Sequence, residues 1–263
     1  MAKKSYNPLN DLPALDDTLD LEDEAYGLDL DAPFDDGAFG EAFDEEPFGA
    51  IEFADNPDPR APCVLVLDTS PSMAGKRIAA LHDGLVAFQG AVRADELAAR
   101  RVEVAIVSFN SKVEVVQDFV TVDAFEPPCL QTTGSTRMAP AIETALDLLD
   151  ERKAVYKQNG VKYYRPWVFL ITDGQPQDRK DVAKQGERIR REEERGGVAF
   201  FAVGVQGADM ELLRETVVRE PVKLDGLKFE EMFLWLSQSL SAVSVSQPGE
   251  GVNLGPISGW GSV

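Results

Sequence analysis

The sequence predicts an α/β fold, a doubly wound and mostly parallel, Rossmann-like sheet with helices on both faces, preceded by an acidic tail. From Cys63 onward, apolar runs of strand length alternate with amphipathic helical segments. Strands that are apolar on both faces and alternate with helices form parallel sheets covered on both sides. Charge separates the tail from the domain, because residues 1–60 hold 18 Asp and Glu against 3 Lys and Arg, a net charge of −15 out of −20 for the whole chain.

The expected strands are short runs rich in apolar and β-branched residues. They are "CVLVLD" from Cys63, "VEVAIVSF" from Val102, "PWVFLITD" from Pro166 and "VAFFAVGV" from Val198. The segment "KVEVVQDFV", from Lys112, follows one of these strands after a short polar turn. We expect it to be a hairpin partner at an edge of the sheet.

The expected helices are marked by apolar side chains that recur every three or four residues. One helix runs through "GKRIAALHDGLVAFQGAV", another follows Pro140, and the last lies in "FEEMFLWLSQSLSAVSVS". Their apolar faces consist of Ile78, Leu81, Leu85, Phe88 and Val92, of Ile142, Ala145, Leu146 and Leu149, and of Phe229, Met232, Phe233, Leu236 and Leu240.

We divide the chain into an acidic tail and linker (1–60), an α/β domain ending in a helix (61–245) and a Gly/Ser-rich C-terminal tail (246–263). The first segment lacks sustained periodicity and is rich in Asp, Glu, Gly and Pro, which is typical of disorder. Its phenylalanines, spaced four or five residues apart, are Phe34, Phe39, Phe43, Phe48 and Phe53. Acidic segments with spaced aromatic residues often fold onto partners, although a solvated tail that maintains solubility explains the composition equally well.

Composition excludes several classes of function and indicates a cytoplasmic protein. The acidic balance disfavours nucleic acid and anionic membrane surfaces as partners. The first residues have no apolar stretch of a secretory signal, and no run approaches the roughly 18 apolar residues of a membrane-spanning helix. Cys63 and Cys129 are expected to be reduced thiols. His82 is the only histidine, which excludes His-rich zinc sites.

Oxygen-bearing side chains cluster where two of the expected strands end. Asp68 ends the first strand and is followed by hydroxyls in "DTSPS", and Asp173 ends the strand "FLITD". The carboxyl ends of parallel strands meet at one edge of the sheet, so these carboxylates can converge on a single crevice. Between them lies "QTTGSTRMAPAI", a loop leading into a helix, which offers further hydroxyls. Oxygen donors from several loops are the ligands that Mg²⁺ prefers.

The string "DTSPS", with Thr136 and Asp173 downstream, resembles the metal-ion-dependent adhesion site of von Willebrand factor A (VWA) domains over residues 62 to about 225. The segments "RVEVAIVSF", "YYRPWVFLITDG" and "FEEMFLWLSQSLSAVSVS" look like the TerY-like group of bacterial VWA proteins. The resemblance implies that Ser70 and Ser72 bind Mg²⁺ or Mn²⁺ directly and that Thr136 binds directly or through water. It implies that Asp68 and Asp173 act through water or hold the hydroxyls.

The same resemblance implies a protein-binding module without enzymatic activity. A partner would offer an Asp or Glu carboxylate to the cation, and the setting would be a stress-response or tellurite-resistance system with kinases and phosphatases. The acidic tail would either mask the site or bind a partner. Three positions depart from the pattern of the group: Pro71 in place of Gly, "GST" in place of a double-Gly form, and Gln175 where an acidic residue is frequent.

Two alternatives remain open from the sequence. One is a VWA domain that serves as a metal-free scaffold. The other is an Asp-dependent hydrolase, since "LDTS" resembles an aspartic protease loop, but that chemistry requires two such carboxylates and an all-β chain. A haloacid-dehalogenase-type phosphatase would need a second carboxylate at the position of Ser70.

Overall fold

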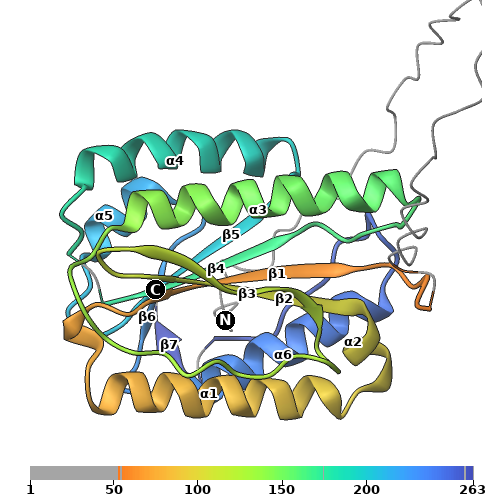
Figure 1. Cartoon of the computed structure of the whole chain (residues 1–263), viewed down its shortest axis with the longest axis horizontal. Coiled ribbons are helices and arrows are strands. Elements are labelled where there is room, and N and C mark those ends of the chain that lie inside the picture. Colours follow the sequence, from red (N-terminus) through yellow and green to blue (C-terminus); the bar gives the residue numbers. More distant parts are fainter. Residues whose placement is uncertain (1–52, 54, 174, 258, 263) are drawn as a thin grey trace, which may run out of the picture.

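The computed structural model describes residues 53, 55–173, 175–257 and 259–262. The expectations for residues 1–52, including most of the acidic tail, therefore lie outside the described residues. The described part is an α/β domain, as the sequence predicts, with helices on both faces of a central sheet (Figure 1).

The central sheet has seven strands in the order β3-β2-β1-β4-β5-β6-β7. The strands are β1 (Ala61–Asp68), β2 (Val102–Phe109), β3 (Val113–Thr121), β4 (Trp167–Thr172), β5 (Ala199–Gly204), β6 (Val222–Leu224) and β7 (Gly261–Ser262). Strands β2, β1, β4, β5 and β6 are parallel, and the edge strands β3 and β7 pair antiparallel with β2 and β6. The expected hairpin partner is therefore confirmed as edge strand β3. All residues of β1, β2, β4 and β5 are buried, which explains their continuous apolar runs.

Helices cover the two faces of the sheet in separate layers (Figure 1). One layer contains α1 (Lys76–Arg93), α2 (Glu96–Arg101) and α6 (Phe229–Val245), and the other contains α3 (Met138–Gln158), α4 (Arg179–Glu194) and α5 (Met210–Thr216). A short 3-10 helix, Pro71–Met73, links β1 to α1. Each layer forms its own hydrophobic cluster against alternate residues of the strands. Except for the partly buried Ile78, the residues predicted for the apolar helix faces are all buried.

Helices α1 and α6 pack closely because a glycine stands at their contact. A Cβ atom added to Gly84 of α1 would lie 2.6 Å from Cδ2 of Phe233 and 3.1 Å from the backbone of Phe229. Only the absence of a side chain allows this approach. By contrast, Gly90 on the same helix faces open space.

The C-terminal residues pack onto the domain. Leu254, Ile257 and Trp260 belong to the hydrophobic cluster on the α1–α6 face of the sheet, and Trp260 is only 2% exposed. The Trp260 ring lies 5.4 Å from the ring of Trp235 in α6. Strand β7 then extends the sheet beyond β6. Residues after 245 thus complete one edge of the domain.

None of the helices within the described ranges has both the length and the apolar character needed to cross a membrane.

Candidate metal centre

The predicted site residues lie at the topological switch point of the sheet. Strand β1 pairs with β2 on one side and with β4 on the other, so the chain leaves β1 and β4 in opposite directions. Asp68 is the last residue of β1, and Asp173 directly follows β4. Ligands of open α/β sheets bind in the crevice at this position. The structure therefore brings the two carboxylates together as the strand pattern predicts.

Asp68 is fully buried and organises the loop that follows it. Its Oδ1 atom accepts a hydrogen bond from the backbone N–H of Ser70 (2.8 Å), and its Oδ2 atom accepts one from the hydroxyl of Thr172 (2.6 Å). Burial raises the pKa of Asp68, the hydrogen bonds oppose that shift, and the nearby charge of Asp173 adds to it. Asp68 thus orients the loop from within the core.

Ser70, Ser72 and Asp173 form a continuous chain of oxygen atoms. The hydroxyls of Ser70 and Ser72 lie 2.9 Å apart, and the Ser72 hydroxyl donates to Oδ1 of Asp173 at 2.7 Å. Ser72 is exposed, whereas Ser70 is buried, so the chain runs from the interior to the surface. Four of the five predicted site residues are therefore connected by hydrogen bonds.

Thr136, the fifth predicted residue, lies in a loop tied to the same edge of the sheet. The N–H of Thr133 donates to the carbonyl of Thr69 (3.0 Å), and the N–H of Gln177 donates to the carbonyl of Thr136 (3.2 Å). Within the described part of the chain, the Thr136 hydroxyl makes no hydrogen bond, although the residue is only 9% exposed. Thr136 thus lies on a loop that is hydrogen-bonded to the segments after β1 and β4, and among the described residues no hydrogen bond joins its side chain to the other four.

Gly134 fixes the path of this loop. Its φ of +74° is a left-handed conformation that favours glycine, and an added Cβ atom would lie 2.2 Å from Oγ of Ser111. The same serine hydroxyl accepts a hydrogen bond from the N–H of Ser135 at 2.8 Å. The loop that carries Thr136 is therefore pressed against the β2–β3 turn, which explains the glycine in "GST".

Arg77 places a positive charge on the site. Its Nη1 atom lies 2.6 Å from Oδ2 of Asp173 and also donates to the carbonyl of Ser72 at 2.8 Å. Arg77 is the second residue of α1, where the helix dipole disfavours a cation. The contact with Asp173 offsets that cost. One oxygen of Asp173 thus holds Ser72, and the other holds an internal cation.

Several residues that shape the site were not singled out from the sequence. Asp178 accepts hydrogen bonds from the N–H groups of Met138 (3.2 Å) and Ala139 (2.9 Å), so the β4–α4 loop caps the helix that follows Thr136. Asn110 donates to the hydroxyl of Thr69 at 3.0 Å. The position of Asp178 in "DGQPQD", directly before the polar helix α4, suggests a cap in sequence, but it does not reveal that the capped helix is α3.

The donor set fits a hard divalent cation. The predicted donors are hydroxyls and carboxylates without nitrogen or sulfur, which favours Mg²⁺ or Mn²⁺ over softer metals. Arg77 shows that the site already attracts positive charge. Among the described residues no group of three or more His, Cys, Asp or Glu side chains could hold a metal, so a cation here would depend on the serine and threonine hydroxyls.

Comparisons with known proteins agree with this fold. Pilus adhesin SpaC from Lactobacillus rhamnosus GG, in its open conformation, has a TM-score of 0.58 at 14% identity, over 70% of this chain and 30% of that one. The PilB minor pilin from Streptococcus sanguinis has a TM-score of 0.55 at 13% identity, over 73% of this chain and 64% of that one. This chain thus spans less than two thirds of either structure, and at such identities the likeness shows the fold alone.

A search of curated protein sequences gives no match. The sequence model of the von Willebrand factor type A domain matches residues 63–223, which include the strands and loops of the site just described. Because the match covers more than half of this chain, the chain belongs to the von Willebrand factor type A domain family.

Proposed function

We propose that this protein is a metal-dependent protein-binding module. Ser70, Ser72 and Thr136 would hold Mg²⁺ or Mn²⁺, while Asp68 and Asp173 would keep the serine loop in position and balance the charge. The observation that carries the proposal is the pair of serine hydroxyls 2.9 Å apart, of which that of Ser72 donates to Asp173 while Asp68 holds the backbone N–H of Ser70. Such a preset arrangement of oxygens suits a small hard cation.

The chemistry of the donors favours binding over catalysis. Neutral hydroxyls leave much of the charge of a dication uncompensated, so the cation would attract a carboxylate from another molecule. Ser72 and Gln175 are exposed, which gives a partner access to this edge of the domain. We therefore propose an Asp or Glu side chain of a partner protein as the final ligand.

The proposal assigns no catalytic residue. The helices on both faces of the sheet contradict the all-β fold that the aspartic protease alternative requires. Hydrolysis by Asp68 is also disfavoured, because both of its oxygens already accept hydrogen bonds in the core. A place in a bacterial stress-response or tellurite-resistance system, alongside kinases and phosphatases, is part of the proposal and rests on the sequence resemblance alone.

A metal-free scaffold is the second candidate, and one contact favours it. Arg77 neutralises Asp173 while Ser72 donates to the other oxygen of that carboxylate, so the network is satisfied by the chain's own atoms. In that case the site would serve to fix the loops at the edge of the sheet.

Calorimetry with Mg²⁺ and Mn²⁺ on the full chain separates the two candidates. We expect one site per chain, together with a rise in melting temperature, since a ligand that binds only the folded state stabilises it by about 2.7 kcal/mol at 100 times Kd. The Ser72→Ala variant should lose most of this effect and still fold, because Ser72 is exposed. Ser241→Ala in α6 is the matched control. Absence of metal binding to the wild-type protein would leave the scaffold candidate.

Capture of partners from the native host tests the remaining step. We expect a set of proteins that binds wild-type protein in millimolar Mg²⁺ and is lost on adding a chelator or in Ser72→Ala. A partner set that is the same with and without chelator would contradict a metal-dependent contact.

A further inference from the structure

A second hollow lies at the end of the sheet opposite the candidate metal centre. There a cavity of about 1240 Å³ opens among the residues that precede β1, β4 and β5, including Pro59, Pro166 and Gly197. These residues lie at the amino ends of the parallel strands, whereas Asp68 and Asp173 lie at the carboxyl ends. The cavity and the metal centre are thus separated by the length of β1, eight residues or roughly 26 Å.

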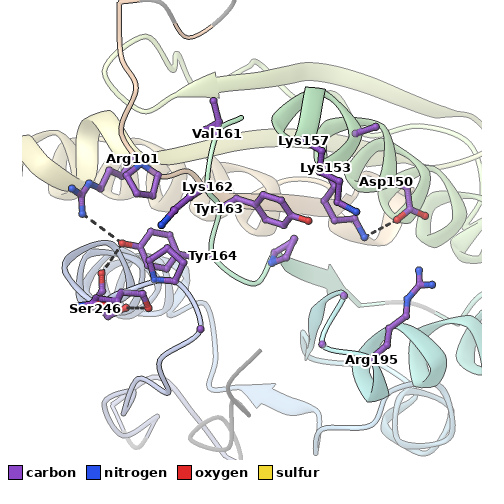
Figure 2. A pocket seen from close by; sticks show the side chains of 18 residues that line it. Arg101, Asp150, Lys153, Lys157, Val161, Lys162, Tyr163, Tyr164, Arg195 and Ser246 are labelled. Atoms are coloured by element: carbon purple, nitrogen blue, oxygen red, sulfur yellow. Dashed lines mark hydrogen bonds and ion pairs between the residues drawn. The ribbon is translucent and has the colours of Figure 1, made fainter. Parts of the chain in front are cut away.

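The cavity is lined by more basic than acidic side chains. Its charged lining residues are Arg101, Lys153, Lys157, Lys162, Arg195 and Asp150. Figure 2 shows Arg101 and Arg195 on opposite sides of the cavity, with Tyr163 between them.

Among the described lining residues the one carboxylate is already neutralised. Asp150 pairs with Lys153 at 2.7 Å and with Arg188 at 3.0 Å. In contrast, Lys157 and Lys162 are exposed and form no ion pair with any described residue. The surplus positive charge available for an anionic ligand therefore lies on these two lysines, because Arg101 and Arg195 pair with Asp58 and Glu192.

The acidic segment of the chain enters the described structure beside this cavity, at residues that do not themselves line it. Phe53, the last of the five spaced phenylalanines, packs on Tyr156 with ring centroids 5.7 Å apart. The guanidinium groups of Arg60 and Arg152 lie 5.1 and 5.0 Å from its ring centroid. Tyr156 in turn lies 5.2 Å from Tyr163, which lines the cavity. Phe53 thus contacts the same aromatic and basic surface that continues into the cavity.

We propose that the acidic, phenylalanine-containing segment of residues 34–52 binds intramolecularly in this basic cavity. Between Phe43 and Phe53 the chain carries four carboxylates, Asp44, Glu45, Glu46 and Glu52, together with Phe48. Each Phe would repeat the contact that Phe53 makes, and the carboxylates would pair with Lys157 and Lys162. The charges of segment and cavity are complementary, and the connection to Phe53 keeps the segment beside the cavity.

The reach of the segment keeps Phe48 near the amino ends of the strands but lets Phe43 reach either end of the domain, since the two ends lie roughly 26 Å apart. Phe48 is five residues from Phe53 and can extend about 17 Å, and Phe43 is ten residues away and can extend about 34 Å. For Phe43, tethering keeps the local concentration near the millimolar range at both destinations. Charge favours the cavity, because Lys157 and Lys162 form no ion pair with any described residue, whereas the charge of Arg77 at the metal centre is already paired with Asp173.

Photo-cross-linking in the full chain tests the proposal. Phe43 is replaced by p-benzoylphenylalanine, and the attachment points are mapped by mass spectrometry. We expect intramolecular cross-links to residues that line the cavity, at positions 150, 153, 154, 157, 161–164, 166, 195–197 and 246–249. The same replacement is made separately at Phe48, in case the photoreactive group disturbs binding when it stands at position 43.

Charge reversal provides the matched controls. In Lys157→Glu/Lys162→Glu the cavity cross-links should fall at least about fivefold, because two attractive contacts become repulsive. Lys180→Glu/Lys184→Glu makes the same charge change on exposed residues of α4 and should leave the yield unchanged. Circular dichroism and melting curves check that both double variants are folded, and Lys157→Gln/Lys162→Gln replaces the first variant if it is not.

Four outcomes would overturn the proposal. They are cross-links to the loops around Ser70 and Thr136, cross-links between two chains, scattered cross-links without preference, and cavity cross-links that persist after reversal of Lys157 and Lys162. The first would favour self-masking of the metal centre, and the second a contact in trans.

Discussion

Replacing Arg77 by Gln should tighten the binding of Mg²⁺ or Mn²⁺ at the candidate metal centre. A cation that approaches Asp173 must displace or share the guanidinium that lies 2.6 Å from Oδ2. The Asp173 side chain is 1% exposed and that of Arg77 is 27% exposed, so their ion pair is intermediate between a surface pair and a buried one. Surface pairs contribute about 0.2–1 kcal/mol, and breaking buried pairs costs about 3–5 kcal/mol.

We take about 1.5 kcal/mol for this contact, which corresponds to roughly a tenfold gain in affinity for the metal once Arg77 is removed. The same substitution should lower the stability of the metal-free protein by a similar amount, because Asp173 then lacks a counter-charge. Calorimetry measures the affinity, and urea unfolding in chelator measures the stability. The two readouts should move in opposite directions.

Lys76→Gln is the matched control for Arg77→Gln. It removes the same charge one residue earlier in α1, from an exposed side chain that forms no ion pair with any described residue. Long-range attraction of the cation would affect both variants alike. If Arg77→Gln binds metal no more tightly than Lys76→Gln, or more weakly than wild type, the competition between Arg77 and the metal is refuted.

Three further substitutions test the packing that supports the domain. Gly134→Ala should weaken metal binding severalfold by shifting the loop that carries Thr136. Gly160→Ala, at a similar φ of +65° but with open space around it, should leave metal binding unchanged, and calorimetry compares the two affinities. Gly84→Ala should lower the free energy of unfolding, measured with urea, by about 1–3 kcal/mol through a clash with α6. Gly90→Ala, at an exposed position on the same helix, should raise the free energy of unfolding by about 0.5–1 kcal/mol. Trp260→Ala should cost about 3–5 kcal/mol, since the ring is buried; a loss below 1 kcal/mol would mean that the C-terminal residues are not held on the sheet.

The arrangement of the strands was readable from the sequence because its signals are local. A run such as "VEVAIVSF" is apolar throughout, and only a strand buried on both faces requires that pattern; the strand found there spans the same residues, Val102–Phe109. The helices α5 and α4 were harder to recognise, since α5 is short and α4 has a strongly polar sequence with few buried residues. Strands β6 and β7 contain three and two residues, too few for any periodicity to be detected.

For the candidate site, too, some features could be predicted from the sequence and others could not. By itself the sequence determined that Asp68 and Asp173 stand at the ends of two separate apolar strands and can converge, because the carboxyl ends of parallel strands share one edge of the sheet. Only the tertiary structure decided that Arg77 pairs with a carboxylate 96 residues away and that Asp178 caps a helix about 40 residues earlier in the chain. It also decided that Trp260 closes the core and that basic residues from α2, α3 and the turn after α4 surround one cavity. Hydrophobic periodicity is repeated within each element, whereas a single contact between distant side chains depends on how the elements are placed and leaves no pattern along the chain.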